Sequence, residues 1–458
     1  MIDLKGERNR LSISQAQFAE LSQIPQYKLS GYEHKKQNLS EEELAQIKDT
    51  LQKIENKTLV VRRKKRICKH VYGSSIMVQR PRRHYAQTHR NEEYRHLLAE
   101  LSYRFKHAQG TTPTAISFFA GCGGLCYGIK AAGFHIVGVN ELVKAYRDIY
   151  ELNFGNTSFL SNDIRDIGTE ELDAILEKYP NIDLLAGGPP CQGFSLAGKR
   201  DVKDDRNTLF QYYLKIAQYI RPKIILMENV KLLTSMKNDT GGLVKDDIIR
   251  TFTEIGYTGS FFIVNAKNYG VPQNRERVFF IGVRKDLNMA PSIPDILRNK
   301  EKGLYTKEYF SFGDATSDLE YLESGECAAN DRYHKAVNHP EHVLRWLVDV
   351  PQGKSAHENA DPGLRPPSGY NTTYKRQVWD EPAATITTNF NMISGCNNVH
   401  PIATRALTIR EAMRIQSFPD DFILSGKEGD IRTVIGNAVP PLLAYEIAKY
   451  LKAYYSLI

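Results

Sequence analysis

A thiol, a carboxyl group and two guanidinium groups stand near strand-like segments in the middle of this 458-residue chain. Cys191 follows two prolines at the end of one such segment, Glu228 follows the next, and Arg275 and Arg277 come later. The thiolate is the nucleophilic form of cysteine, so a reactive cysteine needs positive charge nearby. The alternative for Cys191 is a buried structural cysteine.

A glycine-rich turn between a strand and a helix comes earlier, at residues 120–124. Ala115–Phe119 is predicted to be a buried strand, and a second strand over Ile136–Asn140 ends in Glu141. Glycines let a ligand approach the backbone, and a carboxylate at this point can bind both ribose hydroxyls of an adenosine. Taken alone, the pattern also fits an enzyme that binds a dinucleotide.

Several short motifs in a fixed order are far more specific than any one of them. They are GPPCQGFS at 188–195, ENV at 228–230, QNRER at 273–277 and IGNAVPP at 435–441. With these motifs, the chain from Thr114 to Ile458 resembles the DNA (cytosine-5) methyltransferases. The resemblance implies an α/β fold, with a doubly wound, Rossmann-like, S-adenosylmethionine-dependent methyltransferase domain and a small target-recognition domain.

The resemblance also implies roles for the four reactive groups. The Cys191 thiolate would add to carbon 6 of cytosine, which makes carbon 5 able to attack the methyl sulfonium of S-adenosylmethionine. Glu228 would hydrogen-bond ring nitrogen 3 and the exocyclic amine, with a pKa raised by burial. Arg277 would hold oxygen 2, and Arg275 would support the catalytic loop or a DNA phosphate. The ring faces are stacked in a duplex, so the base must be flipped out.

A pocket for S-adenosylmethionine follows from the same resemblance. Phe119 would stack on the adenine, Glu141 would hold the ribose, and Asp163 would accept a hydrogen bond from the adenine amine. The family usually has Asp where this chain has Ser117, and often an aromatic residue where it has Leu142, so the affinity for the cofactor is open. The other residues expected to line the pocket are Gly121, Gly123, Ile164, Gly188, Leu209 and Asn437.

Residues 1–54 have the pattern of a small helical domain that reads DNA. We predict helices over 15–22, 25–33 and 40–54, with apolar residues at helical spacing. The stretch resembles the helix-turn-helix of phage-repressor-type regulators, in which 25–33 would be the recognition helix. Near its start, Gln26, Tyr27 and Lys28 would contact bases. The alternative is a helical domain that only packs on its neighbour.

Positive charge is concentrated in one segment. Residues 62–95 hold eleven Lys or Arg and two Asp or Glu, a net of +9, while the whole chain has a net of +8. We interpret 55–110 as a basic linker that either contacts phosphates or is a solvated tether. Apolar residues from Tyr94 to Leu101 at helical spacing predict a helix at its end.

The expected domain order is 1–54 helix-turn-helix, 55–110 linker, 111–287 catalytic, 288–375 target recognition and 376–458 completing the catalytic domain. A loop after Phe194, with Lys199 and Arg200, is expected to close over DNA and meet phosphates. In the target-recognition interval the strand–helix alternation fades and Gly, Pro, Asn and Asp increase. The alternative for Arg365, Lys375 and Arg376 is simple surface charge, and none of them can be chosen as a base-reading residue.

Composition excludes several classes of protein. With 41% hydrophobic and 25% charged residues the chain is not fibrous or wholly disordered. The six cysteines show neither a Cys-x-x-Cys pair nor zinc-site spacing, so no metal is expected, and Cys122 and Cys126 are expected to be small buried residues. The long uncharged stretch Ala108–Ile129 is rich in glycine and is interpreted as loop–strand–loop, without a membrane span. A reduced cytoplasmic protein is the expectation.

Three functions are compatible with the sequence. The first is a DNA cytosine-5 methyltransferase, most naturally of a type II restriction–modification system with a cognate endonuclease. The second is a transfer-RNA cytosine-5 methyltransferase of the same fold, against which a helix-turn-helix argues because that module reads duplex major grooves. The third is a transcriptional repressor that acts through residues 1–54. For methylation of double-stranded DNA we expect the chain to act as a monomer. Binding of an operator would favour a dimer.

Overall fold

The computed structural model describes residues 3–11, 13, 15–33, 38–55, 85–155, 157–190, 209–238, 241–294, 309–395 and 397–455. Cys191, Lys199 and Arg200 lie outside the described residues. The chain divides into two units, which we describe separately. The helical unit comprises Met1–Tyr72 and Gly325–Lys335, and the sheet unit comprises Gly73–Ser324 and Ala336–Ile458.

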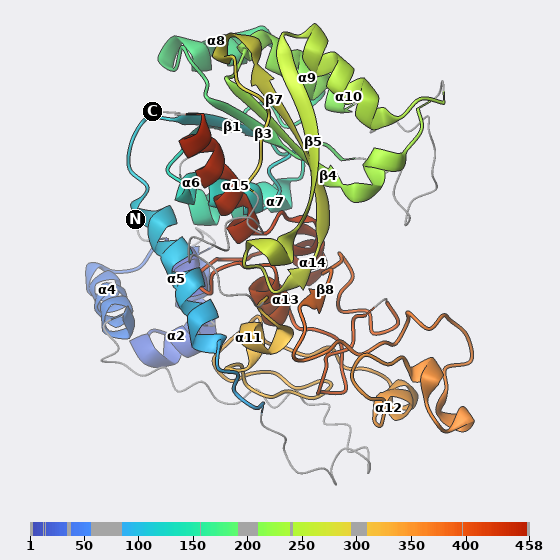
Figure 1. Ribbon diagram of the computed structural model, residues 1–458. Helices are drawn as coiled ribbons and strands as arrows, with labels where there is room; N and C mark the ends of the chain where they lie inside the picture. The colour runs from blue at the N-terminus through green and yellow to red at the C-terminus, as the bar shows by residue number, and fades with distance from the viewer. Residues whose placement is uncertain are drawn as a thin grey trace. The chain divides into compact units, whose positions relative to one another are not determined.

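The sheet unit is built on a six-stranded sheet with the order β2-β1-β3-β4-β7-β5 (Figure 1). Strands β2, β1, β3 and β4 are parallel, whereas β7 runs antiparallel to both β4 and β5. A separate two-stranded sheet pairs β6 with β8. The strands are β1 (Thr114–Phe118), β2 (His135–Val139), β3 (Leu184–Gly187), β4 (Ile224–Val230), β5 (Tyr257–Asn265), β6 (Gln273–Asn274), β7 (Glu276–Arg284) and β8 (Ala383–Ala384).

Helices cover both faces of the large sheet. Helices α8, α9 and α10 lie on one side, and α6, α7 and α15 lie on the other (Figure 1). The helices of the sheet unit are α5 (Asn91–His107), α6 (Gly124–Ala131), α7 (Lys144–Phe154), α8 (Thr169–Lys178), α9 (Leu209–Ile220), α10 (Val244–Glu254), α11 (Phe312–Thr316), α12 (Glu341–Leu347), α13 (Ile409–Ile415), α14 (Glu428–Asn437) and α15 (Pro441–Tyr454).

The apolar runs of the sequence become the central strands because both of their faces are covered. All five residues of β1 are buried, and so are all four of β3. Continuous rather than alternating apolar runs are typical of such strands. On the other side of the sheet α15 packs closely on α6: a Cβ at Gly128 would lie 2.3 Å from the backbone nitrogen of Tyr445.

The predicted α/β fold is confirmed, with one refinement of the sheet. The expected strands at 115–119 and 136–140 are shifted by one residue from β1 and β2. The sheet is mixed, since β7 is reversed between β4 and β5. Strand direction depends on pairing between segments that are distant in sequence, and the apolar pattern does not encode it.

Helix α5 lies within the range that composition assigned to the basic linker. Its apolar side packs on the sheet unit, with Tyr94, Leu98, Leu101 and Phe105 all buried. The hydroxyl of Tyr94 donates to the carbonyl of Arg414 in α13. The helix expected here is therefore present, and it is part of the sheet unit.

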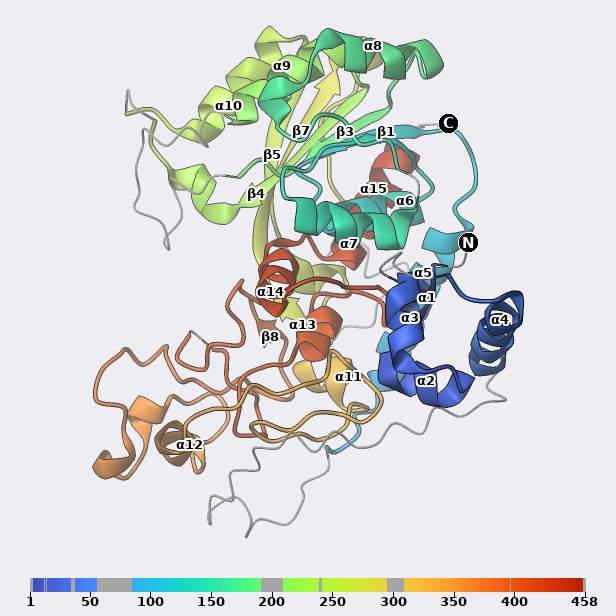
Figure 2. The ribbon, with the colours of Figure 1, turned by 180° about the vertical axis from the view of Figure 1, so that it is seen from behind.

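Residues 336–395 and 397–400 consist mostly of irregular backbone beside α13 and α14, with the short helix α12 (Figure 2). A small core holds this region together, formed by Val343, Leu347, Val350, Ala356, Ile393, Val399 and Ala406. Arg376 belongs to the same region and is buried, donating to carbonyls that include those of Leu347 and Ala403. The interpretation of Arg376 as surface charge is therefore wrong: it is a buried structural residue.

The helical unit contains α1 (Leu4–Arg10), α2 (Gln15–Ser22), α3 (Gln26–Glu33) and α4 (Glu41–Glu55). The three predicted helices are present, and α1 was not predicted. Its Arg8 forms an ion pair of 2.6 Å with Glu33 and donates to the carbonyl of Ile13. The core consists of Leu4, Ile13, Phe18, Ile24, Leu29, Leu39 and Ile47.

Among the described residues, none of the helices combines the length and the apolar character needed to span a bilayer.

Candidate active site

Several of the predicted site residues that the structure describes lie at the carboxyl ends of the parallel strands. Phe119 follows β1, Gly188 follows β3, and Glu228 lies near the end of β4. The chain moves from β1 outward to β2 and then returns to β3 on the other side of β1, so the order switches between β1 and β3. In open α/β sheets, ligands bind in the crevice at such a switch point.

Glu228 and Arg277 form an ion pair inside this site. The Arg277 Nε lies 3.0 Å from the Glu228 Oε1, and both side chains are nearly buried. In the β4–β7 pair, Arg277 lies directly opposite Val230. Glu228 is two residues before Val230 and points to the same face of the sheet, so Glu228 is the diagonal neighbour of Arg277. The sequence placed both residues in one site, and the structure brings them together.

Burial raises the pKa of Glu228, and the positive charges of Arg277 and Arg275 oppose that rise. A carboxyl group with a raised pKa retains a proton more readily at neutral pH. Burial likewise lowers the pKa of Arg277, while Glu228 opposes that change. The pair can therefore offer a proton and a fixed set of N–H donors to a planar heterocycle.

The Arg275 guanidinium donates hydrogen bonds to backbone carbonyls inside the protein. Arg275 is 1% exposed, and it donates to the carbonyls of Ile386, Gly436 and Ala438 at 3.1, 2.9 and 3.0 Å. These bonds join β6 and β7 to the segment after β8 and to the end of α14. A side chain this deeply buried does not reach a DNA phosphate, so that part of the expectation is wrong, and Arg275 is a positioning residue.

Asn229 positions the segment that leads to Cys191, a role that the sequence did not reveal. Its side-chain amide donates to the carbonyl of Pro189 at 2.9 Å. A Cβ at Gly188 would lie 3.1 Å from the Glu228 Oε2, so a glycine at this position leaves room beside the carboxyl group. Since Cys191 lies outside the described residues, its distance from Glu228 is not part of this geometry.

Cys122 and Cys126 are buried, as expected. Burial raises the pKa of Cys122 to about 12 and that of Cys126 to about 11. Thiols with such pKa values carry almost no thiolate at neutral pH, so neither is suited to act as a nucleophile.

Glu141 provides a carboxylate at the end of β2 that fits an adenosine ribose. Its Oε2 accepts from the Gly121 N–H and its Oε1 from the Val143 N–H, both at 2.8 Å. Each carboxylate oxygen has two lone pairs, so one acceptor site on each remains for a ribose hydroxyl. Gly121 and Gly123 have φ values of 58° and 94°, in the region that favours glycine.

The other expected pocket residues differ in what they offer. Phe119 has φ of 55°, a conformation that costs a non-glycine residue roughly 1–3 kcal/mol and is often found at functional sites. The Asp163 carboxylate accepts hydrogen bonds from the side-chain and backbone nitrogens of Arg165, and these bonds lower the pKa of Asp163. Ile164 is buried in the core and Leu209 packs against it. Asn437 is exposed at the end of α14.

Comparison with known proteins agrees with this geometry. The model of the C-5 cytosine-specific DNA methylase family matches residues 113–453. The type II methyltransferase M.DdeI of Desulfomicrobium norvegicum is 33% identical over 378 residues, which cover 74% of this chain and 88% of that protein. The type II methyltransferase M1.HphI of Haemophilus parahaemolyticus is 35% identical over 339 residues, covering 73% and 86%.

A solved structure gives the same fold. The putative DNA modification methyltransferase encoded within an E. coli prophage aligns with a TM-score of 0.58 at 23% identity, covering 75% of this chain and 99% of that one. The family match begins at residue 113, so residues 1–112 lie outside it. The sheet, the Glu228–Arg277 pair and the matched motifs lead to one conclusion: the chain belongs to the C-5 cytosine-specific DNA methylases, and it is a DNA (cytosine-5-)-methyltransferase that uses S-adenosyl-L-methionine.

Proposed function

We propose that this chain is the modification methyltransferase of a type II restriction–modification system, acting on one cytosine within a short sequence of double-stranded DNA. Relatives that cover about three quarters of the chain at 33% and 35% identity are type II methyltransferases. The observation that carries the proposal is the buried Glu228–Arg277 pair beside Gly188. A cognate endonuclease is the partner that this proposal implies.

The residues of this chain divide the reaction between them. The Cys191 thiolate forms a bond with carbon 6 of a flipped cytosine, while Glu228 gives a hydrogen bond or proton to ring nitrogen 3. Charge from the attack is thereby drawn toward nitrogen 3, and carbon 5 becomes nucleophilic. Bound S-adenosylmethionine supplies the electrophilic methyl group. Once carbon 5 carries the methyl group, a water-derived base takes its proton. The electrons of that C–H bond re-form the 5,6 double bond, and the bond between carbon 6 and sulfur breaks to release the Cys191 thiolate.

Arg277 fits a role at oxygen 2 of the cytosine. Its guanidinium is fixed by Glu228 and also donates to the backbone carbonyl of Glu276 at 2.7 Å. A planar, preorganised donor is suited to a carbonyl oxygen that gains negative charge during attack at carbon 6. Asn229 supports the same step by holding the carbonyl of Pro189, two residues before Cys191.

The cofactor pocket is proposed at the β1–β3 switch point. Glu141 would hold the ribose hydroxyls, and Phe119 would stack on the adenine. Gly121, Gly123 and Gly188 would allow close approach of the ligand to the backbone. Asp163 already accepts hydrogen bonds from Arg165. It would therefore accept a hydrogen bond from the adenine amine with the lone pairs that Arg165 does not use. The remaining lining of the proposed cofactor pocket would come from Ile164, Leu209 and Asn437.

Covalent capture tests the proposed chemistry. Plasmid DNA in which every cytosine is replaced by 5-fluorocytosine presents any recognition sequence, and fluorine at carbon 5 cannot leave as a proton. With S-adenosylmethionine, the wild-type chain is expected to form a complex that survives SDS, and Cys191→Ser is expected to form none. An SDS-stable complex with Cys191→Ser, or no complex with the wild type, would overturn the assignment of the nucleophile.

Two further segments are proposed to contact the target DNA. Residues 288–375 would read its sequence, and the loop with Lys199 and Arg200 would contact its phosphates. Within the first segment Tyr370 has a side chain that is 79% exposed, which makes it available to a partner.

We further propose a second, regulatory function for the helical unit: binding of an operator by α3. Tyr27 at the start of α3 is 68% exposed, and Gln26 beside it is also exposed. The Lys28 ammonium instead lies 2.7 Å from Glu43 in α4. We therefore propose that Tyr27 and Gln26 contact bases in a helix-turn-helix formed by α2 and α3, while Lys28 fixes α3 against α4.

A further inference from the structure

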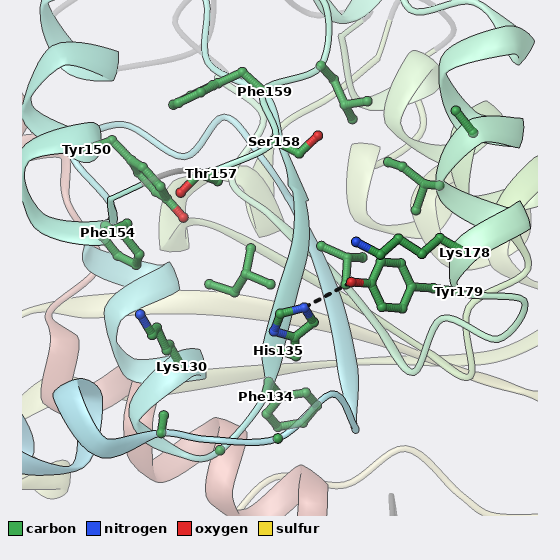
Figure 3. Close-up of a pocket in the computed structure, with 18 of the residues that line it drawn as sticks. Lys130, Phe134, His135, Tyr150, Phe154, Thr157, Ser158, Phe159, Lys178 and Tyr179 are labelled. Carbon is green, nitrogen blue, oxygen red and sulfur yellow. Dashed lines mark hydrogen bonds between the residues drawn. The ribbon is translucent and has the colours of Figure 1, made fainter.

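The segment that leads to Asp163 passes beside β2, the edge strand of the large sheet. Ser158 and Phe159 line a cavity next to this strand (Figure 3). The Val139 N–H donates to the carbonyl of Ser158 at 3.0 Å, and the Val139 carbonyl accepts from the Leu160 N–H at 2.8 Å. The turn after Leu160 therefore begins next to the residues that follow β2.

Asn140 directly follows β2 and joins it to this turn. Asn140 is 1% exposed, and its side-chain amide donates to the backbone carbonyls of Ser161 at 2.6 Å and of Asn162 at 2.8 Å. An amide nitrogen carries two N–H donors, which matches these two acceptors. Asp163 is the next residue of the turn, and Glu141 is the next residue after Asn140. One buried side chain therefore links the two carboxylates of the proposed cofactor pocket.

The backbone of Asn140 connects a third part of the same pocket. Its N–H donates to the carbonyl of Ser117 in β1 at 2.9 Å, and its carbonyl accepts from the Ala120 N–H at 3.1 Å. Phe119, the residue proposed to stack on the adenine, lies between these two partners in the sequence. Three segments that carry proposed cofactor residues are therefore hydrogen-bonded to one residue.

Two further side chains hold the turn from the helices beside it. Arg147 on α7 donates to the side-chain oxygen of Asn162. Glu171 on α8 accepts from the backbone N–H of Ser161 at 2.7 Å and from its hydroxyl at 2.6 Å. These contacts hold the side chains of the turn and one N–H. Asn140 holds two consecutive carbonyls, and it thereby sets the direction of the backbone toward the carboxylate proposed to meet the adenine.

The Asp163 carboxylate has little acceptor capacity to spare, so its placement matters. Arg165 donates to Oδ1 through its backbone nitrogen at 3.0 Å and its Nε at 2.9 Å, and to Oδ2 through its Nη2 at 2.5 Å. Each carboxylate oxygen has two lone pairs, so the acceptor site that remains is on Oδ2. A single acceptor meets the adenine amine only when the turn is correctly placed relative to the ribose.

We propose that Asn140 is a positioning residue that fixes Asp163 relative to Glu141, so that one pocket binds the adenine and the ribose at the same time. This role rests on the cofactor pocket proposed above. The rings of adenosine are rigid, so a pocket already shaped for both ends binds it without first being ordered. Loss of the Asn140 bonds should remove the part of the affinity that depends on the adenine amine, and it should leave the chemistry of Cys191 intact.

Calorimetric titration of the full chain with two ligands tests this role. S-Adenosylhomocysteine carries the adenine amine, and S-inosylhomocysteine has an oxygen in its place. The wild type is expected to bind the first roughly 30-fold more tightly, because an oxo group cannot donate to Asp163. Equal binding of both by the wild type would remove the Asp163 contact, and the role of Asn140 with it. Binding of neither ligand would overturn the proposed pocket as a whole.

Two substitutions of Asn140 show whether its amide is responsible. Asn140→Asp keeps the shape but loses both N–H donors, and Asn140→Ser is too short to reach the two carbonyls and adds no charge. Both are expected to reduce the preference for the adenine ligand to about threefold. The KM for S-adenosylmethionine should rise, while kcat at saturating cofactor should stay within about twofold of the wild type. An unchanged preference in both variants would overturn the proposal.

The control is Asn181→Asp, which adds the same charge at an exposed residue just before β3. Asn181 lies at the amino ends of the parallel strands, whereas the proposed pocket is at their carboxyl ends. Asn181→Asp should keep the roughly 30-fold preference of the wild type. An equal loss of preference in this control, or a kcat that falls in parallel with affinity in the Asn140 variants, would mean general damage to the fold and would also overturn the proposal.

Discussion

The Arg277 guanidinium lies 3.0 Å from the Glu228 carboxylate, with both groups largely shielded from water. This contact moderates a pKa that burial alone would raise further. It also fixes two hydrogen-bonding groups on one face of the β4–β7 pair. In the proposed mechanism, the pair provides a proton donor for ring nitrogen 3 and a guanidinium for oxygen 2 of the cytosine, both held on one rigid element.

Arg277→Gln is expected to move the pH dependence of methyl transfer. Arg277 lowers the pKa of Glu228, so its removal lets that pKa rise. If protonated Glu228 is the active form, the rate falls as pH rises through this pKa, and the falling limb should move up by about one unit. The loss of a donor at oxygen 2 should lower kcat by roughly 100-fold.

A control on the same strand separates this effect from general disturbance of β7. Arg284 lies at the other end of β7 and pairs with Asp286 at 2.7 Å. Arg284→Gln should leave the pH profile of kcat unchanged. A falling limb at the wild-type pH in Arg277→Gln would mean that Glu228 does not control the rate.

Arg275→Gln is expected to destabilise the sheet unit. Three backbone carbonyls would lose their donor inside the protein, and a buried unsatisfied polar group costs about 1–3 kcal/mol. Urea denaturation should show a loss of roughly 3 kcal/mol in the free energy of unfolding. Equal stability of variant and wild type would show that Arg275 does not position these segments.

Glu141→Gln is expected to weaken binding of the cofactor. The amide keeps one acceptor oxygen but loses the charge, so Kd for S-adenosylmethionine should rise roughly 30-fold, about 2 kcal/mol. Calorimetric titration measures this directly. Glu151→Gln on α7, an exposed neighbour, is the matched control and should bind as the wild type. An unchanged Kd in Glu141→Gln would remove Glu141 from the pocket.

Tyr27→Ala is expected to separate regulation from methylation. Loss of an exposed base-contacting side chain should weaken binding to the DNA upstream of the protein's own gene by roughly tenfold. Methylation should be unaffected, since Tyr27 belongs to the helical unit. Gln52→Ala on α4 controls for changes at an exposed helical position. Wild-type affinity of Tyr27→Ala for that DNA would refute the proposed contact.

Local sequence patterns predicted most of the helices and strands, but they did not predict the contacts between segments that are distant in the sequence. The apolar runs at β1, β3 and β4 mark buried strands without any knowledge of their neighbours. Helix α1 was missed because Leu4 is its only apolar residue, so there is no repeating stripe to detect. Its stability comes from tertiary contacts such as the pair between Arg8 and Glu33.

The candidate site shows the same division. Glu228 and Arg277 could be placed together through the family motifs, and Glu141 through its position after a strand. The burial of Arg275 could not be foreseen, because its partners Ile386, Gly436 and Ala438 lie 111, 161 and 163 residues away. Nor did the sequence indicate that Lys28 pairs with Glu43 instead of facing outward.

Bisulfite sequencing of plasmid DNA from cells that express this chain tests the central claim most directly, in a host without its own cytosine methyltransferase. The account predicts protection of one cytosine within a single recurring short sequence, and complete loss of protection with Cys191→Ser. The absence of any protected DNA cytosine, from protein shown to bind S-adenosylmethionine, would contradict it and direct attention to RNA substrates.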